Sequence, residues 1–74
     1  MELSVIYTEI ESGYMGQVLQ WPEVVTEAET IDQCREMLKD ALNEMILAHK
    51  TIGIAIPIAP IFYEKMVLEP DYVS

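Results

Sequence analysis

A chain of 74 residues allows one small domain, and a domain of this size buries only about 60% of the surface that its unfolded chain exposes. Thirteen Asp and Glu against four Lys and Arg give a formal net charge of −9, which disfavours nucleic acids as partners because affinity for phosphates comes largely from cations. Because the single cysteine excludes an internal disulfide and a Cys-x-x-Cys metal site, we expect extra stability to come from oligomerisation.

The chain begins with a predicted hairpin. Residues 3–10 are strand formers that alternate between two faces, and neither face is fully polar. Ser12 and Gly13 supply a turn, and residues 14–19 form the second strand.

A short third strand is predicted after the hairpin. The pair Trp21-Pro22 is expected to interrupt strand pairing, because proline has no backbone donor and forces the preceding residue into an extended conformation. The third strand is therefore predicted over residues 24–28.

One long amphipathic helix is predicted over residues 31–49. Thr30 can act as its N-cap, and Gln33 three residues later can complete a capping box. At 100° per residue the apolar side chains fall within an arc of about 180°, which is wider than packing against one sheet requires. Leu47 adds apolar surface to the opposite, polar face. The members of the arc are Ile31, Cys34, Met37, Leu38, Ala41, Leu42, Met45, Ile46 and Ala48.

The segment "IGIAIPIAPI", residues 52–61, carries no charge although the chain is acidic. Its first four isoleucines recur every second residue, so in an extended segment they point the same way. We predict that residues 52–62 form an extended arm in the interface of a symmetric homodimer, because a thin core has little surface on which to bury this row. The alternative is that the arm folds back over its own helix as a loop. The predicted interface residues are Leu47, Ile52, Ile54, Ile56 and Ile58.

Residues 63–69, "YEKMVLE", predict a last strand. The order of elements is then β-β-β-α-β, an α+β fold with an antiparallel sheet packed on one helix. The domain is expected to cover residues 1–69, and residues 70–74 to form a C-terminal tail.

Polar side chains offer no specific catalytic or metal-binding pattern. Glu9, Glu11 and Asp32 could surround a divalent ion, as in a metal-dependent nuclease, but their spacing is equally typical of solvated surface charge. Cys34 lies within the apolar arc, where a thiol is an inert small hydrophobic group. The single histidine, His49, falls in the last helical turn, where it can interact with free carbonyls. We assign no catalytic residue, no metal site and no cofactor.

Nothing in the chain predicts export or a membrane span. The N-terminus has neither a basic start nor a continuous apolar run. The uncharged segment 52–61 is shorter than the roughly 20 apolar residues of a membrane span, and Pro57 and Pro60 interrupt it. We expect a cytoplasmic protein with no membrane partner.

The run "GYMGQVLQWPEVVTEAETIDQCREMLKDALNEMI" resembles the HicB-like antitoxin family, whose pattern is roughly GGYxAxVPxLPGxxTxGDTxEEAxxNxxEAIxxY. The resemblance covers about residues 3–68. This chain has Pro22-Glu23 where the family has Pro-Gly, and Ala28-Glu29-Thr30 where it has Gly-Asp-Thr, so two residues that tolerate positive φ are lost. Equivalent positions are Gly13, Tyr14, Gly16, Val18, Pro22, Val24, Thr26, Thr30, Asp32, Leu38, Asp40, Ala41 and Met45.

The resemblance implies a partial RNase H-like fold without the carboxylate set of full-length nucleases. It also implies an antitoxin that holds a small basic ribonuclease toxin, HicA, in an inactive complex, and a basic partner agrees with the net charge. Longer family members carry an added DNA-binding domain, for which a chain ending at Ser74 has no room, so we expect no direct contact with nucleic acid. The alternative is a stand-alone homo-oligomeric regulatory or small-ligand-binding domain with no toxin partner.

An acidic surface is predicted around the third strand. Glu23, Glu27 and Glu29 would attract a basic partner, and Trp21 would supply an apolar anchor. The alternative for Trp21 is that it fills the core.

Overall fold

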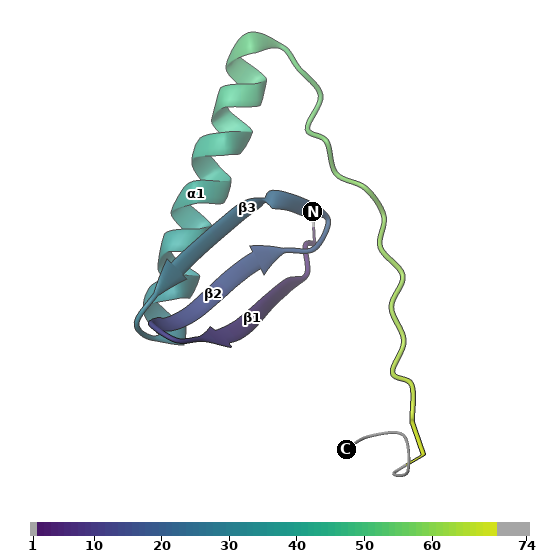
Figure 1. Ribbon diagram of the computed structural model, residues 1–74. Helices are drawn as coiled ribbons and strands as arrows, with labels where there is room; N and C mark the ends of the chain where they lie inside the picture. Colours follow the sequence, from purple (N-terminus) through teal and green to yellow (C-terminus); the bar gives the residue numbers. More distant parts are fainter. Residues whose placement is uncertain (1, 70–74) are drawn as a thin grey trace.

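The computed structural model describes residues 2–69 and consists of a three-stranded sheet followed by one helix (Figure 1). The sheet is antiparallel with the strand order β1-β2-β3, and α1 crosses one of its faces. This confirms the predicted α+β arrangement of an antiparallel sheet packed on one helix. The predicted tail from Pro70 lies outside the described residues. The elements are β1 (Val5–Ile10), β2 (Gly13–Val18), β3 (Trp21–Ala28) and α1 (Ile31–Ile52).

The hairpin of β1 and β2 is confirmed. The two strands pair without interruption from Val5 opposite Val18 to Ile10 opposite Gly13. Gly13 has a φ of +143°, a conformation that L side chains rarely adopt, and a β-carbon there would lie 2.7 Å from the Cα of Glu29. The hairpin therefore requires glycine where its second strand begins.

β3 begins at Trp21 and includes Pro22, which corrects the prediction that this pair interrupts the pairing. The register changes from Gln17 opposite Val25 to Val18 opposite Trp21, so the extra residues of β3 form a bulge. Pro22 is tolerated because β3 is an outer strand and a bulged residue needs no ladder donor. Its carbonyl accepts a hydrogen bond of 2.8 Å from Nε2 of Gln17, which ties the bulge to β2.

The N-cap of α1 follows the sequence prediction, but no hydrogen bond from the side chain of Gln33 back to Thr30 completes the predicted capping box among the described residues. Thr30 has an extended backbone, and its Oγ1 accepts a hydrogen bond of 3.1 Å from the backbone N–H of Gln33. This bond satisfies one of the N–H groups that a helix leaves free in its first turn.

The end of α1 lies at Ile52, beyond the predicted residue 49. Gly53 follows in the left-handed conformation, with a φ of +75°. Its N–H donates to the carbonyl of Lys50, and the N–H of Ile54 donates to the carbonyl of His49 at 2.9 Å. This pair of bonds is a Schellman motif, which explains why the helix continues up to the glycine.

The core is small and lies between α1 and the β2–β3 half of the sheet. Cys34 is fully buried there, as predicted from its place in the apolar arc. The buried hydrophobic residues are Val18, Trp21, Val24, Cys34 and Leu38. Around them lie the partly buried residues Leu3, Ala41, Leu42, Met45, Ile46, Ile56 and Ile58.

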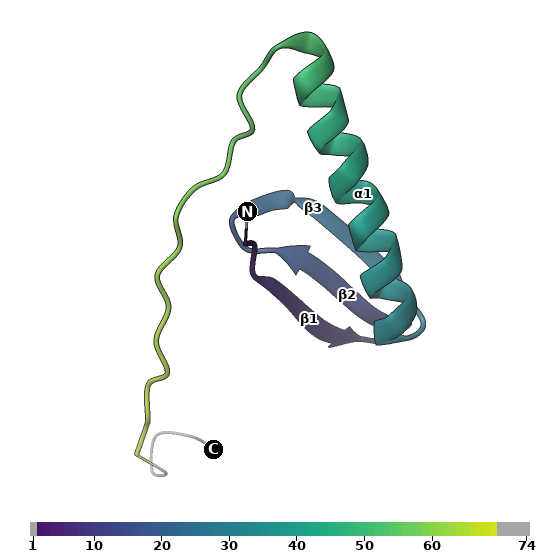
Figure 2. The ribbon, with the colours of Figure 1, turned by 180° about the vertical axis from the view of Figure 1, so that it is seen from behind.

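The chain after Gly53 contains no strand within the described residues, which corrects the prediction of a strand over residues 63–69. We call residues 54–69 the C-terminal arm. It passes the turn between β2 and β3, where the N–H of Ala59 donates to the carbonyl of Gln20 at 3.1 Å, and then leaves the sheet (Figures 1 and 2). A strand forms only when a neighbouring strand supplies its hydrogen bonds, and residues 63–69 have no such neighbour in the described part of the chain.

Candidate partner-binding surface

Trp21 is part of the core and cannot serve as the predicted apolar anchor. Its side chain is only 1% exposed and packs edge-on against the ring of His49, with the ring centroids 5.0 Å apart. The bulge in β3 explains this position. Trp21 and Val24 are three residues apart and would face opposite sides of a regular strand, yet both are buried.

His49 interacts with its own helix as well as with Trp21. Nδ1 of its ring lies 2.8 Å from the carbonyl oxygen of Met45, one turn earlier. The ring therefore does not bond the free carbonyls at the helix end, where the cap of Gly53 supplies the donors instead. His49 has a structural role in the core.

The predicted acidic residues of β3 and the turn after it are exposed. Glu23 and Glu27 lie on β3, and Glu29 follows it immediately. Val25 stands between them in sequence and is 42% exposed, so this edge also presents apolar surface. The outer edge of β3 therefore offers acidic side chains and one accessible valine, without the tryptophan.

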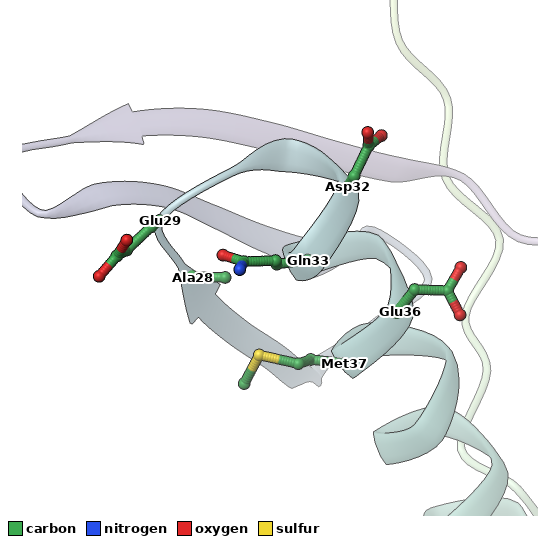
Figure 3. Close-up of a pocket in the computed structure, with 6 residues that line it drawn as sticks. All are labelled: Ala28, Glu29, Asp32, Gln33, Glu36 and Met37. Carbon is green, nitrogen blue, oxygen red and sulfur yellow. The ribbon is translucent and has the colours of Figure 1, made fainter.

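Glu29 also borders an open pocket of about 670 Å³ beside the first turns of α1 (Figure 3). Asp32 and Glu36 lie on the helical side of this pocket, with Ala28 and Met37 as its apolar residues. Figure 3 shows the three carboxylates directed away from one another. The acidic surface thus continues from β3 onto α1. The i, i+4 spacing of the two helical acids is the signal that places them on one face.

Two cations of α1 are paired with these acids. Arg35 contacts Oδ1 of Asp32 at 2.7 Å, and Lys39 contacts Oε1 of Glu36 at 3.7 Å. The hydrogen bond to Asp32 is the main cause that raises the pKa of Arg35, and Tyr7, whose ring centroid lies 5.8 Å from the guanidinium carbon, acts in the same direction. Arg35 stays charged at any physiological pH.

Acidic side chains lie on β1, β3, α1 and the C-terminal arm. Every Asp and Glu between residues 2 and 69 is exposed, and no charged side chain is buried in that range. Exposed carboxylates without local compensation create a negative potential that attracts basic molecules.

The candidate metal ligands do not come together. Among residues 2–69, no three side chains of His, Cys, Asp or Glu lie close enough to hold a metal ion, so Glu9, Glu11 and Asp32 form no shared site. No helix in the same range is long and apolar enough to cross a membrane.

The row of isoleucines predicted as a dimer interface is divided in the structure. Ile52 belongs to α1, so it does not share the extended conformation of the later isoleucines. Ile56 and Ile58 pack against the core of their own chain, as in the fold-back alternative. Leu47, Ile52 and Ile54 remain 65%, 66% and 56% exposed at the end of the helix. The Schellman turn at Gly53 causes the division, because it redirects the chain after the first isoleucine.

Comparison with known families gives one match. The model of a family described as UPF0150-like matches residues 4–57, more than half of the chain, and this range covers β1 to β3, α1 and the start of the C-terminal arm. Searches of curated proteins and of solved structures found no match.

Proposed function

Because the chain belongs to the UPF0150-like family, and because its matched segment contains the HicB-like pattern, we propose that it is an antitoxin-type protein-binding module. In this role it binds a small basic HicA-like ribonuclease and holds the enzyme in an inactive complex. The observation that carries the proposal is the charge distribution. A net charge of −9 stands on a surface where every described acidic side chain is exposed.

The outer edge of β3 is the part of this surface best suited to a basic partner. Glu23, Glu27 and Glu29 supply charge that accelerates encounter, and Val25 supplies apolar area that can be buried in the complex. Because the bulge and Pro22 hinder the addition of another strand to this edge, binding through side chains is favoured over strand addition.

The proposal is tested first by inhibition. A purified HicA-like ribonuclease should lose its RNA-cleaving activity when the protein is added at a 1:1 ratio. The protein alone should cleave no RNA in the presence of Mg²⁺ or Mn²⁺. Failure to inhibit any HicA-like ribonuclease would contradict the antitoxin role, and metal-dependent cleavage by the protein alone would favour the nuclease alternative.

The location of the binding surface is tested with charge variants. The triple variant Glu23→Gln, Glu27→Gln, Glu29→Gln should lower the association rate with the ribonuclease by about tenfold at low salt, with a smaller effect at high salt. The matched control is Glu2→Gln, Asp40→Asn, Glu44→Gln, whose substitutions are also at exposed positions. Each triple variant removes three negative charges, so both change the formal net charge from −9 to −6. Equal effects of the two variants would show that only overall charge matters and that β3 is not the surface.

A further inference from the structure

The two outer edges of the sheet differ in how they are protected. β3 carries a bulge and a proline, both of which oppose the addition of another strand. β1 has a continuous six-residue register, contains neither proline nor lysine, and forms its ladder only with β2 among residues 2–69. The edge of β1 is therefore open to another strand.

A cavity adjoins this open edge. Because α1 packs mainly over β2 and β3, an apolar cavity of about 120 Å³ remains between β1 and α1. Val5 and Tyr7 of β1 line it together with Leu42 of α1. Arg35 and Lys39 belong to the same lining, so half of the chain's four basic residues lie here. We call this cavity the β1–α1 groove.

The distal part of the C-terminal arm has the composition of a strand without a partner. Phe62 and Met66 are 93% and 74% exposed, and Tyr63 and Val67 are 80% and 96% exposed. In an extended segment Phe62, Glu64, Met66 and Leu68 share one face, while Tyr63, Lys65 and Val67 share the other. The first face combines apolar side chains with one carboxylate, which matches an apolar groove that contains two cations.

The arm does not lie on its own β1. Pro57 and Pro60 stand on either side of Ala59, which is bonded to Gln20, and proline restricts the backbone around this anchor. Beyond it the arm extends away from the sheet in both views (Figures 1 and 2). An anchored, proline-containing hinge that holds an apolar segment away from its own domain favours exchange between copies.

We propose that residues 61–69 of one copy add as an outer strand along β1 of a second copy, with Phe62, Glu64 and Met66 facing the β1–α1 groove. A symmetric dimer exchanges two arms. The two Phe62 side chains alone would bury about 300–500 Å², roughly a quarter of the 1,200–2,000 Å² of a stable interface. This interface replaces the divided row of isoleucines, and it leaves the outer edge of β3 free for the proposed ribonuclease partner.

The oligomeric state of the full-length chain gives the first test. Sedimentation velocity should show a dimer at tens of micromolar. The variant Phe62→Ser, Met66→Ser should raise the dimer dissociation constant by about tenfold or more for each side chain lost. The matched control Tyr63→Ser, Val67→Ser changes the opposite face of the same arm and should have a much smaller effect. A monomeric wild type, or equal effects of the two variants, would overturn the proposal.

A charge-reversal experiment separates exchange between copies from pairing within one chain. Glu64→Lys places a cation against a cationic groove, and Arg35→Glu, Lys39→Glu places acids against an acidic arm, so each variant alone should dimerise poorly. In a 1:1 mixture, the arm that carries Glu64→Lys meets the acidic groove of the other variant, and the unchanged acidic arm of that variant meets the unchanged cationic groove. Both contacts of the heterodimer are then complementary, and the dimer should return. Circular dichroism checks that each variant is folded, with Lys39→Glu alone as the substitute if the double variant unfolds. Absence of a dimer in the mixture would show that the arm does not cross between copies.

Discussion

The sheet approaches the helix closely at Gly16. A β-carbon added there would meet Sγ of Cys34 at 2.9 Å and the ring carbons of Tyr7 at 3.2 and 3.3 Å. Cys34 is fully buried, and its Sγ lies 3.6 Å from the backbone carbonyl oxygen of Thr26, so the sulfur has little freedom to move. We predict that Gly16→Ala destabilises the fold although alanine is otherwise the better residue within a strand.

The size of the effect follows from the opposing contributions. Overpacking a core typically costs about 1–3 kcal/mol, and replacing glycine in a strand regains about 0.5–1 kcal/mol. The net loss in the free energy of unfolding is about 1 kcal/mol, within a range of about 0–2.5 kcal/mol, against the roughly 3–5 kcal/mol that a core of this size supplies at most. The melting temperature should fall by about 4–8 °C for each kcal/mol.

A double-mutant cycle isolates the contact. Cys34→Ala removes the sulfur that the new β-carbon would meet. In the Cys34→Ala protein, Gly16→Ala should therefore lower the free energy of unfolding by at least about 1 kcal/mol less than it does in the wild type. The control is Gly53→Ala, where no described atom outside the two adjacent residues lies within 4 Å of the added β-carbon but φ is +75°. That variant should cost about 1–2 kcal/mol in both backgrounds, because its strain arises from the backbone alone.

Urea unfolding followed by tryptophan fluorescence measures all of these variants. Trp21 is the only tryptophan, and it is buried, so its emission reports loss of the core. The chain concentration is kept constant, since the apparent stability of a dimer depends on it. If Gly16→Ala costs the same with and without the sulfur of Cys34, the close approach of β2 to α1 is not the cause.

Two further predictions concern the core and the helix start. Trp21→Ala should lower the free energy of unfolding by about 3–5 kcal/mol and leave the chain largely unfolded at 25 °C. Trp21→Phe should lower it less, because it keeps an aromatic ring against His49 and removes an indole N–H that has no partner among the described residues. A cooperative melt of the alanine variant within a few degrees of wild type would refute the burial of this residue. Thr30→Ala should lower the free energy of unfolding by about 1 kcal/mol, because it removes the hydrogen bond to the N–H of Gln33. The same urea titration measures this loss, and an unchanged midpoint would show that the cap contributes nothing.

Features that depend on neighbouring residues could be predicted from the sequence. The hairpin follows from alternating strand formers around Ser12 and Gly13, and the start of α1 follows from Thr30 as an N-cap. The burial of Cys34 follows from its place in the apolar arc of the helix. In each case the interactions that decide the conformation lie within a few residues, so local patterns are sufficient.

The candidate surface could be predicted only in part. Exposed glutamates around β3 follow from the high content of acidic residues, because charged side chains are almost never buried without a partner. The participation of Asp32 and Glu36 in the same surface depends on how α1 is placed against the end of β3. That placement is set by packing in the core and is not visible in the spacing of the acids alone.

Tertiary structure decided the positions of Trp21 and of residues 63–69. A bulge opposite β2 turns Trp21 toward the helix, although the local sequence Trp-Pro indicates an interruption of the strand. Residues 63–69 have the composition of a strand, but a strand also requires a free edge beside it, and the described chain directs the arm away from its own. The sequence by itself determined the hairpin, the start of the helix and the acidic character of the surface. Which face a bulged residue takes, and whether a strand-forming segment finds a partner, depend on contacts between distant residues, and only the folded structure specifies these.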